Sequence, residues 1–173
     1  MYVETVRSLH GYNEWAMERV LASAEALIPD EFVAEDDTPH GSIRNQFVHV
    51  INTHWSWRSW CDNSMSGEEA YALTLDLADF ADSRSVRDKW HEIRDQNRRF
   101  LSRATGDDMQ RLLEVEAEWI SFSLPVWKIM MHIANHSMQH RTEIAMSLTK
   151  LGQSPGDLDY LFYALEDGSD SPS

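Results

Sequence analysis

Apolar residues recur at spacings of three and four along four long segments of the chain, and this pattern limits the fold more than any other feature. Such spacing places the apolar side chains on one stripe of an α-helix, which must be covered by another element. The predicted helices cover about residues 2–27, 43–60, 83–104 and 125–152. Four amphipathic helices of this length indicate a helix bundle, in which ligand and metal sites are built from side chains on facing helices.

Residues typical of helix boundaries lie at the ends of these segments. Pro29 is expected to end the first helix, and Ser42 is placed to cap the second. Gly106 is expected to stop the third helix. Pro125 suits the first turn of the fourth helix, and Gly152 suits its C-terminal stop.

The segments between and after the long helices are predicted to be short or irregular. Residues 34–42 are expected to form a loop, and the acidic stretch from about 62 to 82 to be irregular. Residues 110–123 alternate more like extended chain than like a helix, which indicates a small hairpin. A short helix at about 156–166 is expected to complete the fold.

Length and composition are those of one globular unit. The chain has 173 residues, of which 42% are hydrophobic and 25% charged, close to the averages for soluble domains. We therefore predict one helix-bundle domain over residues 1–166. Residues 167–173, with little apolar surface to bury, are expected to be a disordered tail.

Charge and cysteine content narrow the class of protein. Acidic residues outnumber basic ones 29 to 15, giving a formal net charge of -14, which opposes binding to the phosphate backbone of nucleic acids. No run of about 18 apolar residues suggests a membrane span, and Glu4 and Arg7 interrupt any signal peptide. The single cysteine, Cys61, excludes an internal disulfide. These features predict a soluble, cytoplasmic protein that binds neither nucleic acid nor membrane.

Three histidines, His132, His136 and His140, recur at every fourth position of the last long helix. Residues four apart lie on the same helix face with Cβ atoms about 6 Å apart, so adjacent members of this stripe suit one metal ion. Both adjacent pairs satisfy this spacing, but the first and third rings are about 12 Å apart along the axis. A third ligand must come from another helix, and His49 and His54 on the second helix are the candidates.

A simpler interpretation is that these histidines are hydrogen-bonded packing residues, as a lone histidine on a half-buried face usually is. Several buried imidazoles without a metal or a partner would, however, desolvate polar groups for no gain in packing. A plain bundle with uncharged core histidines predicts no stoichiometric metal, so the two interpretations make different predictions.

Three sequence blocks together resemble the DinB/YfiT-like superfamily. They are YNEWAMERVL (12–21), GSIRNQFVHVINTHWSW (41–57) and HIANHSMQHRTEIAMSLTKLGQSPGDLDYLFY (132–163), and they span nearly the whole chain. The resemblance implies an up-down-down-up four-helix bundle that holds a divalent metal with one histidine of the second helix and a pair near the end of the chain. On this sequence the implied ligands are His49, His136 and His140.

The resemblance leaves several neighbouring residues without a role on the metal. His132 is expected to form a pocket wall or to contact a ligand, and His54 has no assigned role. Asn13 and Trp15 are expected to fix packing of the first helix, and Cys61 to belong to the core.

Other residues flank the implied ligands in sequence. Asn135 and Gln139 point about 100° away from them on the helix, which argues against a metal role. For Arg141 and Glu143, a surface ion pair is the preferred interpretation over a role in bracing the ligands.

Three neutral imidazoles leave at least one coordination position open, as in catalytic zinc sites. The resemblance implies transferases and isomerases that use low-molecular-weight thiols, together with members of no established activity. We therefore expect a zinc or nickel enzyme of the thiol S-transferase or hydrolase type that acts on a small molecule, although no general base is identifiable. The alternative is a non-catalytic, metal-binding stress-response protein. The resemblance also implies a homodimer.

Overall fold

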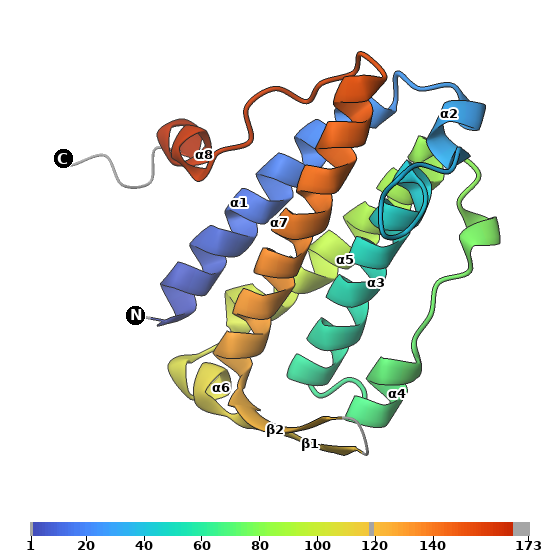
Figure 1. The fold of residues 1–173 in the computed structure, drawn as a ribbon. Helices are drawn as coiled ribbons and strands as arrows, with labels where there is room; N and C mark the ends of the chain where they lie inside the picture. The colour runs from blue at the N-terminus through green and yellow to red at the C-terminus, as the bar shows by residue number, and fades with distance from the viewer. Residues whose placement is uncertain (1, 118–119, 168–173) are drawn as a thin grey trace.

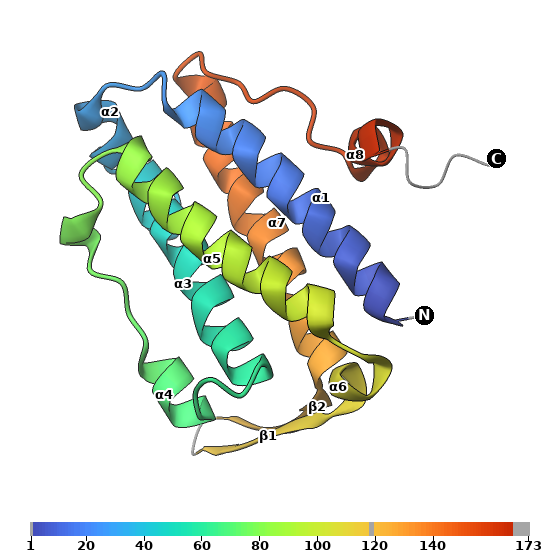
Figure 2. The same ribbon diagram turned by 180° about the vertical axis from the view of Figure 1, so that it is seen from behind.

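Four long helices form the body of the molecule in the computed structural model, which describes residues 2–117 and 120–167. They are α1 (Tyr2–Ala24), α3 (Ile43–Cys61), α5 (Ser83–Arg103) and α7 (Val126–Lys150). α1 and α7 run in one direction and α3 and α5 in the other (Figures 1 and 2). This arrangement confirms the predicted all-α, up-down-down-up bundle.

Short helices lie in the connections. They are α2 (Pro29–Val33), α4 (Gly67–Ala72), the 3₁₀ turn η1 (Leu77–Asp79), α6 (Gly106–Gln110) and the C-terminal α8 (Tyr160–Asp167). Pro29 therefore begins α2, whereas α1 has already ended at Ala24, and Gly106 begins α6 instead of stopping α5. The stretch from 62 to 82 contains α4 and η1, and it returns the chain along the bundle so that α3 and α5 run parallel (Figure 2).

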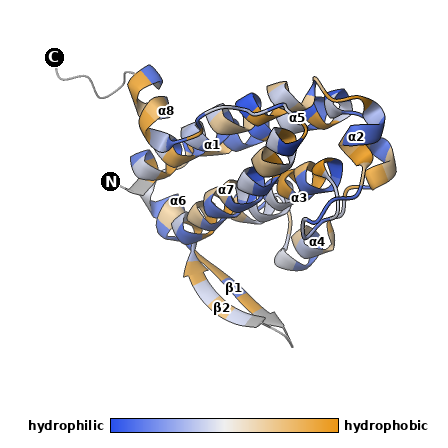
Figure 3. Ribbon diagram, turned by 45° about the horizontal axis from the view of Figure 1, so that its top comes forward, coloured by the Kyte–Doolittle hydropathy of each residue, from blue (hydrophilic) through white to orange (hydrophobic). Residues whose placement is uncertain are grey.

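The predicted hairpin is present as β1 (Leu112–Ala117) and β2 (Ile120–Pro125). The strands are antiparallel, with Leu113 opposite Leu124 and Val115 opposite Phe122. The hairpin projects beyond the end of the bundle (Figure 3). Pro125 ends β2 and forms the N-cap of α7, so it precedes the first helical turn instead of lying within it.

The helix ends near the histidines are fixed by local hydrogen bonds. Ser42 Oγ accepts a hydrogen bond of 3.1 Å from the Asn45 N–H, which confirms the predicted N-cap of α3. Gly152 has a φ of 78°, a conformation that favours glycine, and the following Gln153 N–H donates to Leu148 O at 2.8 Å. These contacts end α7 where the sequence predicts.

The predicted apolar stripes form the core between the helices. Each long helix contributes side chains that are almost fully buried: Val20, Phe47, Ile51, Trp90, Ile93, Ile133 and Ile144. Trp57 and Trp60 are only partly buried and stack on each other near the hairpin, with ring centroids 5.7 Å apart. The core therefore fixes the facing surfaces of α3 and α7, which carry five of the histidines.

α8 lies against α1, with the Tyr12 and Tyr160 rings 5.4 Å apart and Trp15 Nε1 donating to Glu166 at 2.7 Å. The predicted tail lies outside the described residues apart from Asp167, the last residue of α8. Among the helices of the described ranges, none has the length and apolar character needed to cross a membrane.

A buried polar network joins the four long helices beside the histidine stripe. His54, on α3, is 1% exposed, and its Nε2 lies 2.6 Å from Ser137 Oγ and 3.3 Å from Asn13 Nδ2. Its Nδ1 lies 2.8 Å from the amide of Asn97 on α5. Burial, followed by the proximity of His10, His136 and Arg141, lowers the pKa of His54 well below its ordinary value. The ring is therefore neutral and cross-links the bundle.

A second buried histidine, His10 on α1, predicts a dependence of stability on pH. Its Nε2 donates to Met130 O at 3.0 Å, and burial lowers its pKa from 6.5 to about 4 despite that bond. The unfolded chain takes up the proton first, so this stabilisation is complete above pH 6.5 and is lost as the pH falls from 6.5 toward 4. The loss amounts to about 3 kcal/mol of unfolding free energy.

Urea unfolding of metal-free protein at pH 7 and pH 4.5 measures this loss, with His10→Gln as the comparison. The glutamine amide can still donate to Met130 O but does not titrate, so the variant should lose less stability on acidification by about 2 kcal/mol or more. An equal loss in both proteins would contradict a neutral, buried His10.

Candidate metal centre

The three histidines that the resemblance implies as ligands lie together between α3 and α7. His49 Nε2 is 3.1 Å from His136 Nε2. The ring centroid of His140 is 4.7 Å from that of His49 and 4.5 Å from that of His136. α3 and α7 lie side by side (Figure 1). The i, i+4 pair on α7 therefore faces the His49 imidazole on α3. The structure thus brings the predicted residues together.

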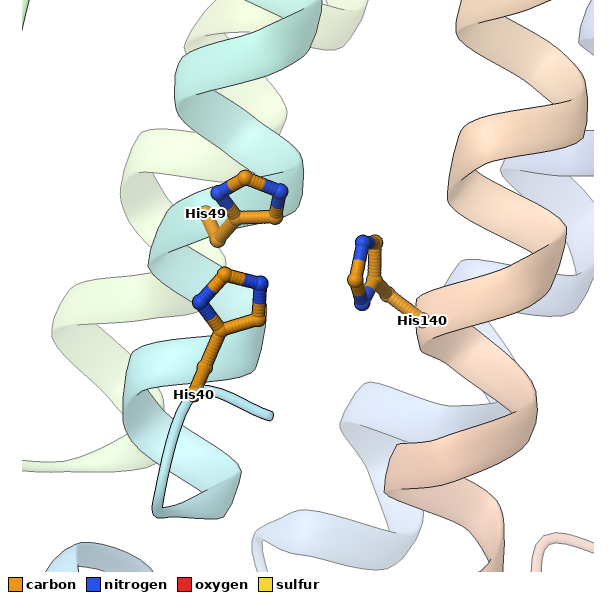
Figure 4. A group of neighbouring side chains, drawn as sticks. All are labelled: His40, His49 and His140. Atoms are coloured by element: carbon orange, nitrogen blue, oxygen red, sulfur yellow. The ribbon is translucent and has the colours of Figure 1, made fainter. Parts of the chain in front are cut away.

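A fourth imidazole, His40, joins this group from the loop before α3. One ring nitrogen from each of His40, His49 and His140 lies within 4.8 Å of those of the other two. Figure 4 shows His40 and His49 one above the other, both facing His140 across the space between α3 and α7. Sequence reasoning assigned residues 34–42 to a loop and missed this residue. One signal in the sequence was available: His40 lies two residues before Ser42, which caps the helix that bears His49, so the His40 side chain can lie near His49.

Three imidazoles of this group, those of His40, His49 and His136, have a lowered pKa, which favours the neutral ring at neutral pH. Burial, followed by proximity to His40 and His140, lowers the pKa of His49 to about 4. Burial, followed by its imidazole neighbours, lowers the pKa of His136 to about 3. Burial also lowers the pKa of His40. Neutral rings have lone pairs available for a cation, so a metal would displace few protons here.

The His140 ring is oriented by side chains on both helices. Its Nδ1 lies 2.9 Å from Glu143 Oε2, one turn later on α7, and 3.2 Å from Gln46 Oε1 on α3. A proton on Nδ1 shared with these oxygens leaves Nε2 as the free lone pair. Such contacts are typical of metal-binding histidines, whose second nitrogen is held by a carboxylate or an amide.

The preferred interpretation of Arg141 and Glu143 as a surface ion pair is wrong. Arg141 is 2% exposed, and its Nη1 donates to Asn13 Oδ1 at 2.6 Å. Its guanidinium also lies 5.1 Å from the centre of the Tyr12 ring. Burial lowers its pKa, and the contact with Tyr12 opposes that shift. The two side chains therefore serve different partners, Arg141 in the buried network and Glu143 on His140.

The Glu143 contact predicts an effect on metal affinity. A glutamine at this position accepts a weaker, uncharged hydrogen bond from His140, so we expect Glu143→Gln to weaken divalent metal binding by about tenfold, within the range known for residues that orient ligands. Competition with a chromophoric chelator measures the affinity. Glu92→Gln, an exposed carboxylate paired with Lys89 on α5, is the matched control. Equal affinities in the two variants would show that Glu143 does not support the site.

The remaining candidates from the sequence lie outside the group. His132 is exposed, with its ring 5.7 Å from that of His136 and edge-on to Trp57 at 5.5 Å, so it borders the site. His54 turns toward the buried network, as described above. Asn135 and Gln139 are exposed on α7, and within residues 2–117 and 120–167 neither side chain hydrogen-bonds to the site.

Asn13 and Cys61 have the packing roles expected of them. Asn13 is buried and joins Arg141 to His54. Cys61 is also buried, and burial raises its pKa to about 12, so it is a core thiol and not a nucleophile.

The geometry suits a divalent transition metal. Two nitrogen ligands on a tetrahedral ion with bonds of 2.0–2.1 Å are about 3.3 Å apart, close to the 3.1 Å between the Nε2 atoms of His49 and His136. His136 Nδ1 is buried and finds no hydrogen-bond partner within the described part of the chain, whereas Nε2 makes the polar contact with His49. An all-imidazole donor set fits zinc, nickel, copper and iron better than magnesium or calcium.

Comparison with known proteins identifies the family of the chain. A search of curated proteins finds no match to the chain. The DinB family, in contrast, matches residues 1–169, which is nearly the full length. With the four-helix bundle and the histidines on α3 and α7 in place, we conclude that the chain belongs to the DinB family.

Proposed function

We propose that this protein binds a divalent metal ion at the histidine group and uses it for thiol S-transfer or hydrolysis, with His49, His136 and His140 as ligands. The observation that carries the proposal is the meeting of three imidazoles from two separate helices at one place, where the His49 and His136 rings are partly exposed. Zinc and nickel both suit these donors. An ion held by imidazoles activates water or a thiol as a nucleophile at neutral pH.

The protein's own side chains supply orientation and access. Glu143 and Gln46 hold the proton of His140 at Nδ1. His49 and His136 are only half-buried, so a small molecule can approach their side of the group. The aromatic ring of Trp57 lies next to His132 at the neighbouring turn, which supports a substrate with an apolar part.

Elemental analysis of protein purified without a histidine tag is the first test. We expect about one zinc or nickel ion per chain, followed by turnover of electrophiles with low-molecular-weight thiols or of esters with water. Loss of this reactivity after chelation and its return on adding the ion would support the proposal. A metal-loaded protein inert toward both panels would refute the catalytic part.

One observation favours a second function, in which the ion is structural. His40 adds a fourth imidazole to the three expected, and four protein donors are typical of closed structural zinc sites. In that case, chelation should lower the melting temperature strongly, since the ion ties α3 to α7. Added thiols should then leave the absorption spectrum of the cobalt-substituted protein unchanged.

We also propose that the protein is cytoplasmic and forms a homodimer. Exposed Met138 and Met146 on α7 provide apolar surface suited to a partner copy. Light scattering of the purified protein distinguishes a dimer from a monomer of 20.0 kDa.

A further inference from the structure

The loop that carries His40 is tied to both helices that bear the other imidazoles. Ser147 Oγ on α7 donates to Asp36 Oδ2 at 2.6 Å, and Asn45 Nδ2 on α3 donates to His40 O at 2.9 Å. Within the loop, the Asp36 N–H donates to Gly41 O at 2.6 Å, and Gly41 has a φ of 81° that favours glycine. The loop is therefore built to hold the backbone of His40 at a fixed place.

The charge of Asp36 supports this anchor. Burial alone would raise the pKa of Asp36, but hydrogen bonds from Ser147 and Thr38 hold it below its ordinary value. A charged acceptor strengthens the bond from Ser147. Ser147 lies on α7 two turns beyond His140. Its hydrogen bond to Asp36 therefore fixes the position of the His40 loop relative to the helix that carries His140.

The His40 ring itself has no hydrogen-bond partner among the residues that the structure describes, although it is half-buried. It stacks on His49, with centroids 3.9 Å apart and planes at 26°, and lies 5.0 Å from the His140 ring. Stacking explains the ring plane but not why a ring nitrogen faces His140 (Figure 4). Polar groups that leave water normally find a partner, and an ion within the group would supply one.

We infer that His40 is a metal ligand, so that the ion receives four imidazoles, from His40, His49, His136 and His140. This inference rests on the proposed metal binding but not on catalysis. Whether His40 is bound then determines whether the ion has an open coordination position for a substrate. With His40 bound, a four-coordinate ion has no open position, and a thiol or water must either add as a fifth ligand or replace His40.

Cobalt(II) substitution tests this inference without any assay of activity. We expect His40→Ala to bind one Co²⁺ at least about tenfold more weakly than the wild type and to change its visible d–d spectrum. Millimolar imidazole should bind in the vacated position and restore a spectrum like that of the wild type, whereas the wild type should be unaffected. His91→Ala, which removes a half-buried imidazole on α5, is the matched control and should behave as the wild type.

The outcomes separate this inference from the proposed function. Wild-type affinity and spectrum in His40→Ala, with Co²⁺ lost in His49→Ala, would overturn the His40 assignment alone and leave the metal site intact. A wild-type protein that binds no Co²⁺, Zn²⁺ or Ni²⁺ would overturn both. Circular dichroism of each metal-free variant checks folding, which His40→Ala should retain because the residue lies on a half-exposed loop.

Discussion

Replacing His49 with alanine is expected to abolish stoichiometric binding of zinc or nickel, with a loss of affinity of at least about 100-fold. His49 is the one imidazole on α3 that contacts every other ring of the group, including that of His40 at 3.9 Å and that of His136 at 4.9 Å. Residues that only orient a ligand are worth 10 to 100-fold in affinity, so a direct ligand must be worth more. The prediction holds whether or not His40 is also a ligand.

Dialysis against a metal buffer followed by elemental analysis measures this loss. His132→Ala is the matched control, since it removes an imidazole from the same stripe of α7 that borders the group without joining it. The control should retain about one ion per chain. Full metal content in His49→Ala, or equal losses in the two variants, would show that the ion is held elsewhere or that histidines bind it nonspecifically.

Helix periodicity predicted the frame of this site because long amphipathic segments are specified locally. The stripes of α3 and α7 are continuous over several turns, so their periodicity predicted that a histidine of α3 would face an i, i+4 histidine pair of α7. Spacing alone left His54 open as an alternative, and only the resemblance chose between His49 and His54. The structure explains the difference: His54 turns toward Ser137 and Asn97 in the interior.

Features outside that periodicity were not predicted. α2, α4 and α6 have five or six residues each, too few for a repeating stripe. His40 lies in a loop whose path depends on tertiary hydrogen bonds such as that from Ser147. Arg141 is buried although arginine is nearly always exposed unless paired, and its partner, Asn13, lies 128 residues away. Such long-range pairings leave no local signal.

The buried network predicts the largest effect on stability. His54→Ala should lower the free energy of unfolding by about 3–5 kcal/mol, because it opens a cavity in the bundle and removes the partner of Ser137, Asn97 and Asn13 at once. For a chain of this size, the loss corresponds to a fall in melting temperature of roughly 10 °C. Metal affinity should change little, since the nitrogens of His54 face the network and not the ion.

Two further variants separate the causes of this loss. His54→Phe keeps a ring of similar shape without hydrogen bonds. The difference in unfolding free energy between His54→Phe and His54→Ala measures the cost of the cavity. The difference between His54→Phe and the wild type measures the cost of the unpaired polar groups. His91→Ala, half-buried against Glu18, should shift the free energy by about 0.5 kcal/mol or less. If His54→Ala lost its metal but kept its stability, the ring would be a ligand, and the division of the histidines between the network and the metal centre would be wrong. His54 and His49 are five residues apart on α3. The metal content and stability of His54→Ala therefore test directly whether His54 is a structural imidazole while His49, one turn away, binds the metal.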